Sequence, residues 1–232
     1  MGTFWRTHGA DRKLVRDVAA IAAASAVIGV SFGAIASAAG VPAWAIVTMS
    51  LAVFAGGAQF MAVGMIAVGS PVAAIAGGLL LNARHLPFGL SIADVFRGEG
   101  RLRRLAGVHL MVDESVAFSL AQADPRRREA AYWLTGASLF VAWNTGTVLG
   151  ILLGAAVGDP MRYGLDAAFP AALIALLLPR LREPIGLRVG LLGAAVAVAA
   201  TFVLPPGLPV LLALVALVAA WRAPVRARRS AS

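Results

Sequence analysis

Charged side chains stand inside long apolar stretches of this chain, where few proteins place them. Arg84 comes after residues 18–83, which contain no Asp, Glu, Lys or Arg. An arginine at the centre of a membrane helix costs roughly 2.5–3.5 kcal/mol on insertion scales, so we expect Arg84 to face protein or water. Its planar guanidinium could clamp the carboxylate of a substrate. It could equally form a permanent ion pair with Asp113, Glu114 or Asp166, and the sequence leaves both roles open.

A histidine and two acids within one apolar segment could move protons. His109 and Asp113 are four residues apart, so a continuous helix would place them on one face, with Glu114 about 100° around from Asp113. An imidazole and a carboxylate in a partly buried segment are suitable parts of a proton relay. The alternative is an interfacial helix whose polar face touches water. The candidates for proton coupling are His109, Asp113, Glu114 and Asp166.

Small residues and an amide interrupt another uncharged stretch, at Phe54-Ala55-Gly56-Gly57-Ala58-Gln59-Phe60. Paired glycines before an amide allow a helix to open, and open backbone survives inside a membrane only where protein buries it or water reaches it. Such interruptions often indicate the binding site of a transporter. A close helix crossing, with Gln59 bonded to a neighbour, is the alternative explanation. The candidate substrate-binding residues are Gly56, Gly57, Ala58, Gln59, Asn82, Arg84 and Asn144.

No pattern typical of an enzyme occurs in the chain. It contains no cysteine, which excludes disulfides and thiolate chemistry. It has no Walker loop for ATP, its histidines lack the spacing of a zinc helix, and no serine stands in a nucleophile elbow. We therefore expect no enzymatic activity, no metal site and no cofactor. An intramembrane enzyme built on His109 and Asp113 would lack any nucleophile or metal pattern.

The composition predicts that helices in a membrane hold these residues. Hydrophobic residues make up 60% of the chain, charged residues 13%, and the mean hydropathy is +0.84. A helix needs about 20 apolar residues to cross a bilayer, so we predict an all-α integral membrane protein, a polytopic bundle of about 7–8 hydrophobic helical segments, some of which could be discontinuous. The segments are Val18–Ala39, Ala43–Val68, Pro71–Ile92, Leu105–Ala121, Ala130–Val157, Met161–Leu178, Ile185–Leu204 and Leu208–Trp221.

Clusters of arginine predict the orientation of the bundle. The net charge is +9, and arginines gather beside the apolar segments and at both ends of the chain. This is the positive-inside pattern, so we expect both termini in the cytoplasm and the protein in the cytoplasmic membrane. Since topology explains the charge and no aromatic residues interleave with the arginines, nucleic-acid binding is not expected. The expected domains are a basic N-terminal segment 1–17, a transmembrane domain 18–221 and a basic tail 222–232.

The first half of the chain fits the charge pattern less simply. If Pro71–Ile92 crossed the membrane fully, the basic loop at 97–104 would lie outside, against the rule. Either that loop is an exception, or Pro71–Ile92 or Leu105–Ala121 is re-entrant or discontinuous. An internal repeat could also exist, since Gly40-Val41-Pro42 and Phe54–Gly57 resemble the later Gly158-Asp159-Pro160 and Phe169–Ala172. Transporters are often built from repeats, although chance recurrence of small residues explains the similarity of these segments equally well.

The motifs, taken in order, resemble the AzlC family of branched-chain amino acid permeases, over residues 15–221. The resemblance implies a secondary transporter that exports valine, leucine, isoleucine or a similar small amino acid. It also implies a small, hydrophobic partner subunit of the AzlD type. Gly57 stands where the family leads us to expect a serine, which puts the substrate preference in question. The motifs are Phe54–Phe60, Asn82–His85 with Gly89-Leu90-Ser91, Asp113-Glu114-Ser115, Trp143-Asn144 with Gly146, Thr147 and Gly150, and Gly164–Ala171.

Two hypotheses of different classes follow. The first is an exporter driven by the proton motive force, with the lipid bilayer and an amino acid as its partners. The second is a membrane scaffold that transports nothing and assembles with a small hydrophobic subunit, in which Arg84 and the acids form assembly pairs. Efflux of labelled amino acids from proteoliposomes separates them.

Overall fold

The computed structural model describes residues 11–67, 69–157, 174, 178, 181–204 and 208–216. Every regular element in this part of the chain is helical and no strand occurs in it, which confirms the prediction of an all-α fold there. Apart from residues 174 and 178, the predicted span Met161–Leu178 lies outside the described residues. So do the basic tail, the second copy of the proposed repeat and Asp166. The described elements are α2 (Arg12–Ala38), α3 (Ala43–Val53), α4 (Gly56–Ala67), α5 (Pro71–Asn82), α6 (His85–Ser91), η1 (Ala93–Phe96), α7 (Arg101–His109), α8 (Asp113–Leu120), α9 (Pro125–Val157), α11 (Pro184–Thr201), α12 (Leu208–Leu212) and η3 (Ala213–Ala216).

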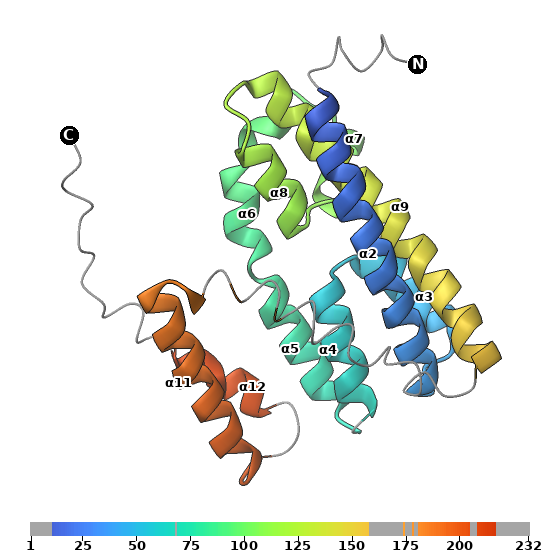
Figure 1. The fold of residues 1–232 in the computed structure, drawn as a ribbon, viewed down its shortest axis with the longest axis vertical. Coiled ribbons are helices and arrows are strands. Elements are labelled where there is room, and N and C mark those ends of the chain that lie inside the picture. Colours follow the sequence, from blue (N-terminus) through green and yellow to red (C-terminus); the bar gives the residue numbers. More distant parts are fainter. Residues whose placement is uncertain are drawn as a thin grey trace.

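Among the described helices, α2, α9 and α11 are long and apolar enough to cross a membrane. Helices α2 and α9 pack closely because small residues let their backbones touch. A Cβ at Gly146 or Gly150 of α9 would collide with the carbonyl oxygens of Ala26 and Val30 in α2. Since the residue numbers rise together along this contact, the two helices run parallel (Figure 1). Lipid leaves little hydrophobic force between helices, so close approach through glycine supplies the packing.

Ion pairs fasten the first turns of α2 and α9 to their surroundings. Asp11 caps α2 by accepting a hydrogen bond from the Leu14 backbone N–H at 2.8 Å, and it pairs with Arg127 of α9. Arg128 pairs with Asp94 of η1 at 3.0 Å. These arginines precede the predicted segment Ala130–Val157 but lie in the first turn of α9, because that helix already begins at Pro125. We call this end of the bundle the arginine-rich end.

The uncharged stretch Ala43–Val68, predicted as one span, folds instead as a helical hairpin. Helix α3 ends before Phe54, whose φ of 42° and ψ of 51° are left-handed, and α4 begins two residues later. Helix α3 runs antiparallel to α9, since Ser50 lies beside Thr147 and Phe54 reaches Phe140. Helix α4 then returns toward the end where α3 began and packs on α5 (Figure 1). The left-handed conformation of a non-glycine residue costs roughly 1–2 kcal/mol, so the surrounding packing must hold this break.

A second hairpin, formed by α7 and α8, replaces the predicted helix Leu105–Ala121. Helix α7 runs along α9 away from the arginine-rich end, and the carbonyl of Gly107 accepts a hydrogen bond from the Tyr132 hydroxyl at 2.8 Å. Helix α8 runs back, so that the Ser119 hydroxyl donates to the Arg128 carbonyl at 3.1 Å. The two hairpins therefore enter the bundle from opposite ends.

The break in the second hairpin overturns one prediction. His109 is the last residue of α7 and Asp113 the first of α8, so they do not share the face of one helix. Between them the chain leaves the helical conformation, and Val112 adopts an extended one. Ser115 stabilises the new start, because its hydroxyl oxygen accepts a hydrogen bond from the Val112 backbone N–H at 2.9 Å. The four-residue spacing of His109 and Asp113 therefore does not place them on one helical face.

The stretch Pro71–Ile92 is interrupted at its polar residues, which is one of the alternatives that the charge pattern left open. Helix α5 ends at Asn82 and α6 begins at His85, with Arg84 between them. The Nδ1 atom of His85 lies 2.9 Å from the Asn82 carbonyl oxygen and holds the turn. Helix α6 continues toward the arginine-rich end, where Arg128 reaches the carbonyl of Ser91.

Candidate functional site

The tips of both hairpins lie against Phe140, at the middle of α9. The Phe140 ring centroid is 5.0 Å from that of Phe54 in the first hairpin and 5.5 Å from that of His109 in the second. The rings of Phe54 and His109 are 6.4 Å apart. The break between α5 and α6 joins them, because Arg84 contacts Asp113 at the start of α8. All three helix interruptions of this described region thus meet at one level of the bundle.

The first turn of α4 is built around a buried amide. Gln59 is 1% exposed, and its Oε1 accepts a hydrogen bond from the Ala55 backbone N–H at 3.1 Å. This bond satisfies one of the backbone donors that a helix start leaves open. The Nε2 of Gln59 has no hydrogen-bond partner among the described residues. An unsatisfied buried donor costs roughly 1–3 kcal/mol, so Gln59 offers an unused donor at the helix break.

The paired glycines differ in their surroundings. A Cβ at Gly56 would lie 2.9 Å from the Trp143 ring, whereas a Cβ at Gly57 would lie 3.5 Å from a methyl of Leu81. Trp143 cannot give way easily, because it is 6% exposed and stacks on Phe32 with centroids 5.6 Å apart. Gly56 therefore allows the tip to rest on α9. Ala58, the next candidate along the chain, is buried.

Asn144 ties the first hairpin to α9. The Ser50 hydroxyl donates to Asn144 Oδ1 at 2.8 Å and lies 3.3 Å from the Thr147 hydroxyl. The Nδ2 of Asn144 donates to the Phe140 carbonyl. The sequence analysis did not single out Ser50, and it named Thr147 within a family motif without giving it a role; both residues are 1% exposed. The available signal for Thr147 was its position about one helical turn after Asn144. For Ser50 it was a hydroxyl within an uncharged helix.

Arg84 and Asp113 carry the charges of the site. The Arg84 Nε lies 3.2 Å from Asp113 Oδ1, and the side chains are 36% and 47% exposed. This contact is an ion pair without hydrogen-bond geometry, since Arg84 Nε has no hydrogen-bond partner in the described part of the chain. Glu114 follows Asp113 in the first turn of α8 and is half-buried. Of the two predicted partners that the structure describes, Asp113 and Glu114, it is Asp113 that contacts Arg84, and Asp166 lies outside the described residues.

The two helix starts at this level differ in charge. Helix N-termini carry a partial positive charge. The first turn of α8 contains Asp113 and Glu114, whereas the first turn of α4 contains no acid. The tip of the first hairpin is therefore electropositive and the tip of the second is acidic. No group of residues that could hold a metal ion occurs in the described ranges.

Asn82 is placed at the same level by the break after α5. Its carbonyl contacts His85, and its buried Oδ1 has no hydrogen-bond partner among the described residues. An acceptor at Asn82 and a donor at Gln59 are the unsatisfied amide groups near the breaks. Such groups suit a small polar ligand or ordered water.

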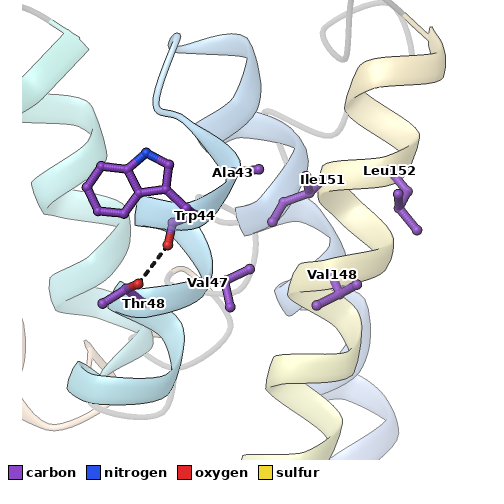
Figure 2. A pocket seen from close by; sticks show the side chains of 7 residues that line it. All are labelled: Ala43, Trp44, Val47, Thr48, Val148, Ile151 and Leu152. Carbon is purple, nitrogen blue, oxygen red and sulfur yellow. Dashed lines mark hydrogen bonds between the residues drawn. The ribbon is translucent and has the colours of Figure 1, made fainter.

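A groove of about 390 Å³ lies elsewhere, between α3 and α9 (Figure 2). Its one hydroxyl, on Thr48, donates to the Trp44 carbonyl at 2.7 Å, so apart from the Trp44 indole N–H the side chains that line the groove offer apolar contacts. It lies toward the end of α9 far from the arginine-rich end, away from Arg84 and Asp113. It is therefore a poor candidate for the chemistry of the site. The lining residues are Ala43, Trp44, Val47, Thr48, Val148, Ile151 and Leu152.

Comparisons with known proteins agree with the sequence motifs. The family described as AzlC protein matches residues 20–157, which include both hairpins and all three breaks. The branched-chain amino acid transport protein AzlC of Bacillus subtilis is 27% identical over 154 residues, 65% of this chain and 60% of that protein. An uncharacterized membrane protein of Haemophilus influenzae is 27% identical over 46% of this chain and 45% of its own length. The chain thus spans less than two thirds of these relatives, and no solved structure matches it significantly.

Proposed function

Since this chain belongs to the AzlC family, we propose that it is a secondary transporter exporting branched-chain or similar small amino acids. The observation that carries the proposal is the meeting of three helix breaks beside an ion pair, midway along α9. Discontinuous helices near the middle of the bilayer are where secondary transporters bind substrates and coupling ions. The name of the Bacillus subtilis relative supports the amino acid substrate.

The bundle sits in the cytoplasmic membrane with its arginine-rich end inside. Helices α2, α9 and α11 have the length and composition of membrane spans. The ion-paired arginines lie at the N-terminal ends of α2 and α9. The positive-inside rule places these ends in the cytoplasm together with the N-terminus, and the arginines of the C-terminal sequence predict the same side for the C-terminus. The second hairpin then enters from the cytoplasm and the first from outside.

The substrate binds between the two hairpin tips. Gly56, Gly57 and Ala58 present backbone N–H groups at the start of α4, and Gln59 adds its unused donor. These donors suit a carboxylate. Asn82 and Arg84 contribute from the break between α5 and α6, while Asn144 fixes the first hairpin in place.

The proton motive force drives export through acids and a histidine near the same level. His109 lies between the rings of Phe54 and Phe140, at the tip of the second hairpin, and Asp113 and Glu114 start α8. A histidine can change its charge near neutral pH, as a proton-coupled carrier requires. Asp166, outside the described residues, is a further candidate for coupling.

A small hydrophobic subunit of the AzlD type completes the transporter. Large apolar side chains such as Leu79, Leu86 and Leu90 of α5 and α6 are 70%, 74% and 81% exposed. In a membrane, lipid or another apolar chain covers such side chains. A partner on α5 and α6 would lie next to the break that contains Arg84.

Reconstitution tests the function directly. Proteoliposomes loaded with labelled valine, leucine or isoleucine should release the label when a pH gradient is imposed, and faster with the small subunit present. Liposomes without protein and a load of labelled sucrose serve as controls. If the protein is folded yet no amino acid leaves faster than from liposomes without protein, with or without the small subunit, the scaffold hypothesis replaces the transporter hypothesis.

A further inference from the structure

We infer that Arg84 and Asp113 form an exchangeable ion pair that a zwitterion replaces on binding: the substrate carboxylate takes Arg84 and the substrate ammonium takes Asp113. This inference rests on the proposed function and names the part of an amino acid that the site recognises. It also joins two roles of Arg84 that the sequence left as alternatives, the permanent pair and the carboxylate clamp.

The pair is looser than the other ion pairs between helices. Arg84 and Asp113 approach at 3.2 Å without a hydrogen bond. At the arginine-rich end, Arg103 contacts Glu129 at 2.6 Å, with a hydrogen bond, and Arg128 contacts Asp94 at 3.0 Å. The guanidinium of arginine is built for a planar, two-bond grip on a carboxylate, and Asp113 does not supply it.

The two partners belong to separate helix breaks. Arg84 lies between α5 and α6, whereas Asp113 begins α8 at the tip of a hairpin. Local contacts do not lock them together, unlike the pair between Lys13 and Asp17, one turn apart in α2. Both side chains are also partly exposed, at 36% and 47%, although the Nε atom of Arg84 itself is buried.

Charge balance explains why a zwitterion fits this site better than an ion of one sign. Inside a membrane an unpaired charge is costly. In the empty site each charge satisfies the other, and a bound zwitterion satisfies both in their place. A carboxylate alone would displace Asp113 from Arg84 and leave the aspartate unpaired, while an amine alone would leave the arginine unpaired. The site should therefore reject molecules that carry only one of the two groups.

The test compares three ligands of one shape on the purified full-length protein in detergent. Valine carries both groups, 3-methylbutanoate lacks the amine, and isobutylamine lacks the carboxylate. We expect calorimetry to show the two single-charge ligands binding at least about tenfold more weakly than valine to the wild type. Removing one partner should reverse this preference. Asp113→Asn should bind 3-methylbutanoate at least about tenfold more tightly than the wild type does and should no longer bind valine. Arg84→Gln should bind isobutylamine more tightly by a similar factor.

Two further variants make the result decisive. Asp94→Asn removes the Arg128 pair at the arginine-rich end and should leave all three affinities unchanged. The double variant Arg84→Gln/Asp113→Asn removes both partners of the pair, so it serves if a single variant does not fold, and it should lose valine binding. Folded single variants whose affinities for the single-charge ligands stay at wild-type values would overturn the inference, as would wild-type valine affinity in the double variant. Absence of amino acid binding by the wild type would instead overturn the proposed function.

Discussion

Adding one methyl group to each of the paired glycines in turn should separate their roles. In Gly56→Ala the new Cβ would meet the Trp143 ring at 2.9 Å, and in Gly57→Ala it would meet Leu81 at 3.5 Å. Carbon atoms in favourable contact are about 3.5–4.0 Å apart, so the first variant must move the indole or the hairpin tip by roughly 0.6 Å or more, and the second need not move anything. The two variants share the same chemical change on the same helix.

The free energies follow from this difference. Overpacking of a filled core costs about 1–3 kcal/mol, and Trp143 is held by Phe32 and Phe60 at centroid distances of 5.6 and 6.2 Å. Alanine in place of glycine contributes up to about 1 kcal/mol of helix propensity in both variants. We therefore expect Gly56→Ala to be less stable than Gly57→Ala by about 1–3 kcal/mol.

Unfolding of the purified variants by sodium dodecyl sulfate, followed by circular dichroism, measures this difference. Valine efflux from proteoliposomes should fall in Gly56→Ala, because the hairpin tip leaves its seat on α9. Gly64→Ala, where a Cβ meets no atom within 4 Å, is the control for helix propensity alone. If Gly56→Ala proves as stable as Gly57→Ala, the tip does not rest on Trp143 and the described contact is wrong.

Three further outcomes are expected. Gln59→Leu should destabilise the protein by roughly 1–3 kcal/mol in the same unfolding assay, because it leaves a buried backbone N–H at the break without an acceptor, and an unchanged stability would show that the amide caps nothing. The hydrogen bond from the Leu14 backbone N–H lowers the pKa of Asp11 below its ordinary value of 3.8. The stability that ionised Asp11 contributes to the folded protein is therefore fully present above pH 3.8 and is lost as the pH falls through the lowered pKa. Thermal unfolding should therefore find Asp11→Ala less stable than wild type at pH 7 and the gap closing in strong acid; a gap independent of pH would contradict this. Single cysteines at Thr3 and Ser230, in a chain without native cysteine, should resist impermeant thiol reagents in intact cells, and labelling of either would refute the cytoplasmic placement of that terminus.

Local composition was enough to predict helices, and it allowed a break within Pro71–Ile92 as one alternative. Helical character follows from apolar runs long enough for a bilayer, and the break at Asn82–His85 follows from polar residues inside such a run. The glycine pair also pointed to an interruption, but its position is shifted, because the left-handed residue is Phe54 rather than a glycine. Contacts of Phe54 with Phe140 and His109 hold that conformation, and no local pattern reports them.

The sequence did not predict the second hairpin, and the reason is physical. Leu110-Met111-Val112 contains no glycine or proline, so nothing local ends α7 there. Gly136 of α9 provides the room instead, since a Cβ at that position would lie 2.8 Å from the Leu110 carbonyl. A helix in an apolar chain continues or reverses according to what packs beside it, because both conformations bury similar side chains.

The sequence by itself therefore determined which residues carry charge in an apolar setting, and that helices hold them. It named Asp113, Glu114 and Asp166 as possible partners of Arg84 without choosing between them. Among the described residues, the tertiary structure brings Asp113 to Arg84, because the reversal between α7 and α8 places the start of α8 at the break after α5; Asp166 lies outside the described residues. The distance between two charges depends on how distant segments pack, and spacing along the chain decides that distance only while one helix continues unbroken between them.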